Sequence, residues 1–179
     1  MDNTYKYLDS EYLKKLLEVV SKNHYQMLLI SEPENLDLNP KSKKLKEEII
    51  DWITKNGGKY YDISQIVVEL LEEDISSVEI GLKLNDIIYD IISKNSGIPE
   101  PIIFDNVGLL FSKDFGGLEP IRTFKYHSRT HPIVLFVPLK LNKLRQTATF
   151  GNPGDEDYRS DIDISEIICV ELKEMMADG

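Results

Sequence analysis

Short apolar runs alternate with amphipathic segments along most of this chain, and this alternation limits the fold more than any other feature. The apolar runs, each short enough for a buried strand, cover residues 26–31, 59–63, 101–106, 132–137 and 166–172. The amphipathic segments between them predict helices, beginning at Asp9 or Ser10 and then over 41–55, 65–73, 78–94 and 118–128. In the first of these, Leu13, Leu16, Leu17 and Val20 recur at i, i+3, i+4 and i+7.

Strands separated by helices are typical of parallel βαβ units. We therefore predict one α/β domain over residues 1–179, a three-layer αβα sandwich with a mostly parallel five-stranded sheet. Residues 146–164 predict a loop or a hairpin, because a Gly-Asn-Pro-Gly turn divides two short runs. Ligands in open α/β sheets bind at the carboxyl ends of the strands, so the residues after each strand are the candidates for function.

Composition excludes several classes of protein. No apolar run approaches the roughly 20 residues of a membrane span, and the single cysteine, Cys169, forms no internal disulfide framework. We expect a cytoplasmic protein without membrane contact. A net charge of −10 disfavours autonomous nucleic-acid binding, which needs clustered Lys and Arg.

The segment after the first strand stands where a phosphate-binding loop would stand. It ends in Lys41-Ser42, like the G-x-x-x-x-G-K-[ST] motif, but residues 31–42 contain no glycine. Ser31 and Lys41 are also further apart than the first glycine and the lysine of that motif. The acids Glu32, Glu34 and Asp37 would repel a triphosphate. These features favour a simple strand–helix turn over an ATP site.

The third strand ends in Asp105, as a Walker B strand does, where the acid holds Mg²⁺. The next residue is Asn106, which cannot act as a base. A turn-capping Asp at a strand end explains the pattern equally well. If nucleotide binds, Lys41, Ser42 and Asp105 are the expected ligands of ATP and Mg²⁺; otherwise no cofactor is expected.

No catalytic set emerges elsewhere: there is no G-x-S-x-G elbow and no metal-binding His or Cys spacing. Arg129, just before the fourth strand, is a solvated residue, a partner contact or a sensor of charge on a bound nucleotide. The 149–159 segment is an acidic hairpin tip or a docking loop, with Tyr158 and Arg159 at its end. Arg129, Tyr158 and Arg159 are therefore the candidate partner-binding residues.

The order of these pieces resembles the small P-loop protein (BrxF-type) of BREX bacteriophage-exclusion systems. The matching pieces are Lys41-Ser42, the run Ile102-Ile103-Phe104-Asp105-Asn106-Val107-Gly108-Leu109-Leu110-Phe111, Ser128-Arg129-Thr130, and Thr149-Phe150-Gly151-Asn152-Pro153-Gly154 with Tyr158-Arg159. The resemblance covers nearly the whole chain, although no piece is as specific as an intact Walker A motif.

The resemblance implies a P-loop NTPase-like fold and a cytoplasmic antiviral-defence protein that works with other proteins of its system. An oligomer of this chain is also possible. It places nucleotide binding on Lys41, Ser42 and Asp105. Because the loop departs from the motif, we expect a non-catalytic subunit that acts through protein–protein contacts. The alternative is a divergent Mg-dependent ATP-binding protein or ATPase of the same system.

Overall fold

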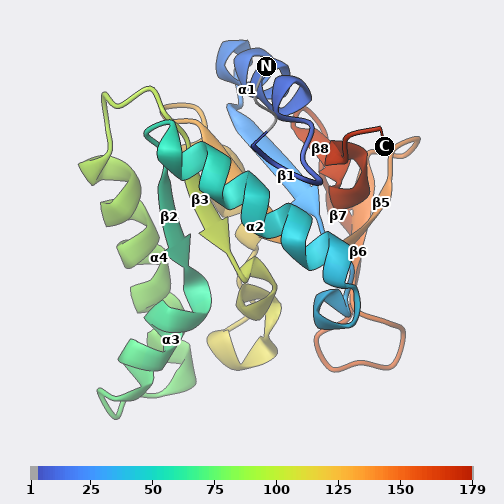
Figure 1. Cartoon of the computed structure of the whole chain (residues 1–179). Helices are drawn as coiled ribbons and strands as arrows, with labels where there is room; N and C mark the ends of the chain where they lie inside the picture. Colours follow the sequence, from blue (N-terminus) through green and yellow to red (C-terminus); the bar gives the residue numbers. More distant parts are fainter. Residues whose placement is uncertain (1–3, 179) are drawn as a thin grey trace.

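A computed structural model describes residues 4–178 and places a five-stranded, wholly parallel sheet at the centre of the protein (Figure 1). The strand order is β2-β3-β4-β1-β8. The bounds are β1 Met27–Ser31, β2 Lys59–Asp62, β3 Ile102–Asp105, β4 Ile133–Val137 and β8 Ile168–Glu171. All five lie within the predicted apolar runs. β1 is flanked by β4 and β8, so it lies inside the sheet.

Helices cover both faces of this sheet (Figure 1). One face packs against α1 (Ser10–Lys22) and α2 (Pro40–Lys55), and the other against α3 (Ile63–Leu71), α4 (Ser77–Lys94) and α5 (Pro120–His127). Asp9 caps α1 by accepting from the Tyr12 N–H, and Asp62 caps α3 by accepting from the Ser64 N–H. The α/β sandwich predicted from the sequence is confirmed in this architecture.

Alternation along each strand divides the core between the two faces. In β1, Leu28 and Ile30 pack against the α1–α2 layer, whereas Met27 and Leu29 pack against the α3–α5 layer. Every residue of β1 and β4 is buried, which explains why these strands read as continuous apolar runs.

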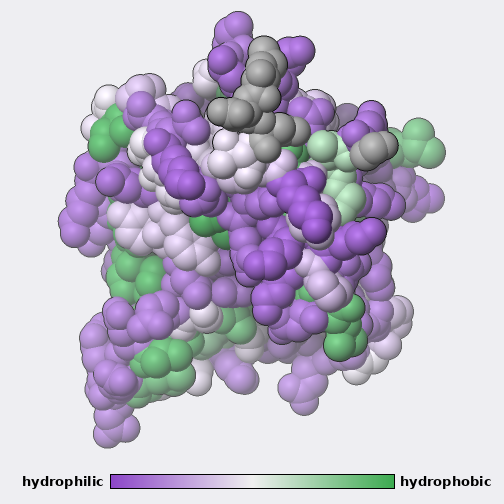
Figure 2. All heavy atoms as spheres, viewed as in Figure 1, coloured by the Kyte–Doolittle hydropathy of each residue, from purple (hydrophilic) through white to green (hydrophobic). Residues whose placement is uncertain are grey.

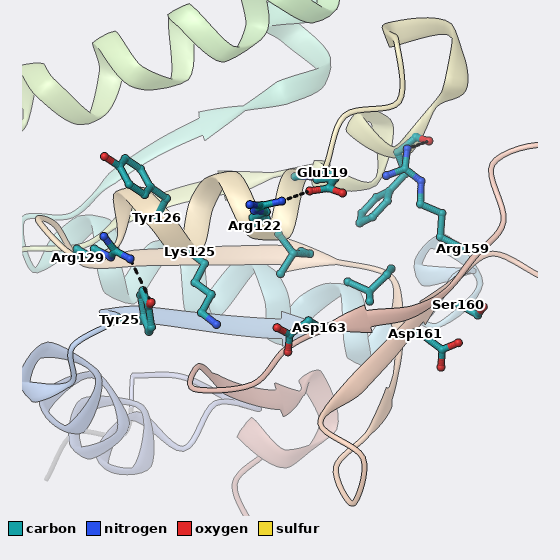
Figure 3. A pocket seen from close by; sticks show the side chains of 14 residues that line it. Tyr25, Glu119, Arg122, Lys125, Tyr126, Arg129, Arg159, Ser160, Asp161 and Asp163 are labelled. Atoms are coloured by element: carbon teal, nitrogen blue, oxygen red, sulfur yellow. Dashed lines mark hydrogen bonds and ion pairs between the residues drawn. The ribbon is translucent and has the colours of Figure 1, made fainter.

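A second, antiparallel sheet follows β4 and consists of β5 (Leu139–Asn142), β6 (Thr147–Phe150) and β7 (Arg159–Asp163). The hairpin expected over 146–164 is present as β6 and β7, but β5 was not predicted. β7 lies beside α5 (Figure 3). The small sheet adds Leu139 and Ala148 to the core, and Ile164 follows β7 into it.

The surface is mostly hydrophilic, with separated apolar patches such as the one over the α3–α4 region (Figure 2). Among residues 4–178, no helix has the length and apolarity needed to cross a bilayer.

Candidate functional site: an ion-pair cluster at the strand ends

The chain diverges at the carboxyl edge of the sheet. The segment after β1 leads to α2 on one face, whereas the segments after β2 and β3 lead to α3 and α5 on the other face. Such a divergence creates the crevice in which open α/β sheets bind ligands. The side chains that meet there come from the ends of β1 and β3 and from the middle of α2.

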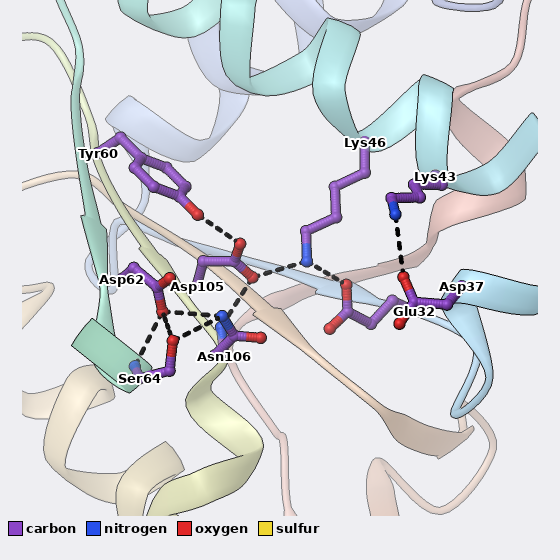
Figure 4. A network of polar contacts seen from close by, with 9 residues as sticks. All are labelled: Glu32, Asp37, Lys43, Lys46, Tyr60, Asp62, Ser64, Asp105 and Asn106. Atoms are coloured by element: carbon purple, nitrogen blue, oxygen red, sulfur yellow. Dashed lines mark hydrogen bonds and ion pairs between the residues drawn. The ribbon is translucent and has the colours of Figure 1, made fainter. Parts of the chain in front are cut away.

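Lys46 of α2 joins Glu32 and Asp105 in a buried ion-pair cluster (Figure 4). Its Nζ lies 2.7 Å from Glu32 Oε2 and 2.7 Å from Asp105 Oδ1. The three side chains are 9%, 9% and 7% exposed. Removing one member of a buried pair costs about 3–5 kcal/mol, because the other charge is left uncompensated. The cluster is therefore a fixed part of the fold.

Asp105 is fully occupied by donors of the chain itself. Besides the ammonium of Lys46, its carboxylate accepts the Tyr60 hydroxyl at 2.6 Å and the backbone N–H of Asn106 at 2.7 Å. A metal ion at the end of β3 would have to displace these donors. In the part of the chain that the structure describes, no group of three or more His, Cys, Asp or Glu side chains could hold a metal.

Two carboxylates share one ammonium, so the cluster carries one excess negative charge when all three groups are ionised. Burial raises the pKa of Glu32 above its ordinary value of 4.5, and the ion pair with Lys46 offsets this only in part. Burial alone would lower the pKa of Lys46, but Glu32 and Asp105 outweigh it and raise that pKa. Lys46 thus stays charged at neutral pH.

Several backbone amides between β1 and α2 are already engaged within the chain. A phosphate loop binds through several N–H groups that point at the ligand. Here the N–H groups of Glu32, Leu38, Asn39 and Lys43 donate to backbone carbonyls. The N–H of Ser42 donates to the Asn39 side chain at 3.2 Å, and Pro40 has no N–H. The first turn of α2 is capped by its own chain rather than left open.

The three acids of this segment each pair with a lysine. Glu32 binds Lys46, Asp37 lies 3.1 Å from Lys43, and Glu34 lies 3.8 Å from Lys140. The last two pairs are exposed and contribute little stability. Because these lysines already face carboxylates of the same chain, they offer little positive charge to a bound phosphate.

A hollow of about 960 Å³ opens beside the cluster. Its lining includes six acidic residues and two lysines, namely Glu32, Glu34, Asp37, Glu47, Asp105, Asp157, Lys43 and Lys46. Carboxylates at this density repel a triphosphate. The hollow suits a cationic or neutral group better than a nucleotide.

Asn106 ties the end of β3 to the end of β2. It adopts the left-handed conformation with φ 57°, and its amide donates to Asp62 Oδ1 at 2.8 Å and to Ser64 Oγ at 3.4 Å (Figure 4). Burial works to raise the pKa of Asp62, but these hydrogen bonds and those from Ser64 lower it below its ordinary value. Asn106 therefore acts as a structural clamp at the position where many ATPases carry a catalytic glutamate.

The predicted nucleotide ligands are not assembled around Asp105. Lys41 is exposed in the first turn of α2, and Ser42 is buried beneath it. The lysine that pairs with Asp105 is Lys46, which the sequence argument missed. A signal was present: Ser42, Leu45, Lys46, Ile49 and Ile53 form one helical stripe, and a charge within such a stripe indicates a buried partner.

The three predicted partner-binding residues have different roles. Arg129 is exposed and lies at the amino end of β4, the opposite edge of the sheet from Asp105, so it cannot sense a phosphate there. Arg159 is part-buried: its guanidinium donates to the carbonyls of Leu118 and Phe111. It therefore supports the loop before α5. Tyr158 is half-buried beside it.

Comparisons with protein-family models, with curated proteins and with solved structures give no match for this chain.

Proposed function

We propose that this protein is a non-catalytic subunit of a prokaryotic BREX-type antiviral defence complex, with a degenerate P-loop NTPase-like domain that acts through protein–protein contacts in the cytoplasm. Three positions support the P-loop relationship: an interior first strand, a strand–helix segment ending in Lys41-Ser42, and an acid at the end of β3. The family resemblance given above supports the defence role.

The single observation that carries the non-catalytic assignment is the double ion pair of Lys46 with Glu32 and Asp105. ATP and Mg²⁺ at these strand ends would have to break that buried cluster, at a cost of about 3–5 kcal/mol. The segment before α2 would also have to give up its internal amide hydrogen bonds, each worth roughly 0.5–1.5 kcal/mol. Tight binding of a nucleotide would need other contacts to offset these costs, and the acidic lining of the hollow repels the phosphates.

The position of Asp105 favours one alternative, a divergent Mg-dependent ATP-binding protein, because an acid after a buried strand is where such proteins hold Mg²⁺. In that case Lys41 and Ser42 would meet the phosphates after the segment 31–42 had rearranged. The two functions predict different effects of the variant Lys41→Ala on defence: none for the non-catalytic subunit, and a loss for the ATP-binding protein.

Phage challenge of the host strain separates these functions. Deleting the gene should abolish protection, whereas the variants Lys41→Ala and Ser42→Ala, made in place, should protect as the native protein does. Loss of protection in Lys41→Ala, with the protein folded and expressed at its normal level, would support the ATP-binding alternative. Full protection after deletion would rule out the defence role.

A further inference from the structure

A groove of about 810 Å³ runs between α5 and β7 (Figure 3). Its two walls differ in net charge. Arg122 and Lys125 of α5, with Glu119 at its start and Arg129 just beyond it, line one wall. Asp161 and Asp163 of β7 line the other, together with Arg159, whose guanidinium is bound to backbone carbonyls. Pockets of this size bury most of a drug-sized ligand, so the groove has room for a short polypeptide segment.

Arg129 is held in place on the basic wall without being neutralised. Its guanidinium lies 5.4 Å from the ring centre of Tyr25 and 5.1 Å from that of Tyr126, and it donates to the Tyr25 hydroxyl at 3.3 Å (Figure 3). Among residues 4–178, no carboxylate forms an ion pair with Arg129. An ordered, exposed arginine flanked by two tyrosines is the composition typical of binding hot spots.

The other cations of this wall are less available. Lys125 lies 3.5 Å from Glu166 and over the ring of Tyr25, and Arg122 lies 3.2 Å from Glu119. Arg129 is thus the cation best placed to receive an incoming anion. A planar guanidinium binds a carboxylate through two parallel hydrogen bonds.

We propose that this groove binds an acidic segment of a partner protein, with a carboxylate of that segment paired to Arg129 between Tyr25 and Tyr126. The inference rests on the proposed function, since it names the surface and the partner chemistry of an interaction subunit. The apolar lining, which includes Phe111, Ile121 and Ile162, would receive the uncharged side chains of the segment.

The groove favours a polypeptide over a nucleic acid. A nucleic-acid backbone carries a phosphate at every step and would meet Glu119, Asp161 and Asp163 as well as the basic wall. A net charge of −10 repels a phosphate backbone at every step, and repels a segment with one or two acids less. A polypeptide can place an acid against Arg129 and a neutral or basic residue against β7, so both walls are satisfied.

Selection from a random peptide library displayed on phage tests the proposal, because the library contains acidic, basic and neutral sequences alike. The whole protein serves as bait, and clones that bind the empty support are removed. We expect the remaining peptides to be enriched in Asp and Glu. A selected peptide should bind at least about tenfold more weakly to Arg129→Ala, and Arg129→Lys should not restore binding because the two-pronged contact is lost.

The matched control is Lys44→Ala, which removes one exposed positive charge from α2, on the opposite face of the sheet from α5, and should leave peptide affinity unchanged. Enrichment of basic or neutral peptides, or equal binding to Arg129→Ala, would overturn the proposal. An oligo-dT strand that bound more tightly than the selected peptide, and only when Arg129 was present, would assign the groove to nucleic acid instead. These binding results do not depend on phage protection, so this inference and the defence role can fail separately.

Discussion

The Lys46 ammonium lies 2.7 Å from the Asp105 carboxylate, so the acid at the end of β3 is already bound to a cation of its own chain. Glu32, at the end of β1, holds the same ammonium from the other side. In an intact P-loop site a lysine faces phosphate and the acid after the strand holds Mg²⁺. Here the two charges neutralise each other across the crevice.

Replacing Lys46 should destabilise the protein far more than replacing Lys41. Lys46→Met leaves two carboxylates in a buried site, and we expect the free energy of unfolding to fall by about 3–5 kcal/mol. Lys41→Ala changes an exposed residue and should stay within about 0.5 kcal/mol of the native protein. Denaturant titration of both variants measures the difference, and equal stability of the two would show that the cluster is not formed.

Removing the carboxylates as well should recover stability lost in Lys46→Met. The combined variant Glu32→Gln, Lys46→Met, Asp105→Asn has no buried charge left to desolvate, so the penalty of uncompensated buried carboxylates is removed. We expect it to regain about half or more of the loss. A triple variant as unstable as Lys46→Met would mean that packing of the lysine stem, rather than charge, sets its contribution.

The stability of the native protein relative to Glu32→Gln should fall as the pH rises. The folded-state pKa of Glu32 is raised above its ordinary value of 4.5, so the folded protein keeps a proton that the unfolded chain has lost. That favours the native state at pH near 4.5, and the advantage disappears as the pH rises through the folded pKa. The free energy of unfolding of both proteins, measured from pH 4 to pH 7, checks this direction. A difference that rises with pH would mean that the ion pair with Lys46 outweighs burial and lowers the pKa of Glu32.

Asn106 should contribute through both its conformation and its side chain. Asn106→Ala keeps the left-handed backbone without the hydrogen bonds to Asp62 and Ser64, and we expect a loss of about 1–3 kcal/mol. Asn106→Gly removes only the hydrogen bonds, because glycine adopts positive φ freely, so it should cost less. In both variants the pKa of Asp62, followed by NMR, should rise. An unchanged pKa would show that Asn106 does not reach Asp62.

Sequence alone was sufficient for the sheet and most of its helices. β1, β3 and β4 stand out because a parallel sheet buries both faces of its strands and leaves uninterrupted apolar runs. β5 was missed because Leu139-Lys140-Leu141-Asn142 is too short and too polar to separate from a loop. Its pairing with β6 depends on contacts that local pattern does not encode.

The site was predicted less completely than the fold. The positions of the crevice and of Asp105 could be predicted from where the strands end. The partner of Asp105 could not, because it depends on how α2 is rotated over the sheet. That rotation brings in Lys46 and turns Lys41 to solvent. Likewise, Arg159 was expected at a surface, and only the packed structure shows its guanidinium on the carbonyls of Phe111 and Leu118.

Calorimetric titration of the folded protein with ATP and Mg²⁺ tests the central claim most directly, with Lys41→Ala as the paired variant. Because Lys46, Glu32 and Asp105 bind one another and the segment before α2 is acidic, we predict no measurable binding at millimolar nucleotide. Saturable binding that disappears in Lys41→Ala would contradict the account.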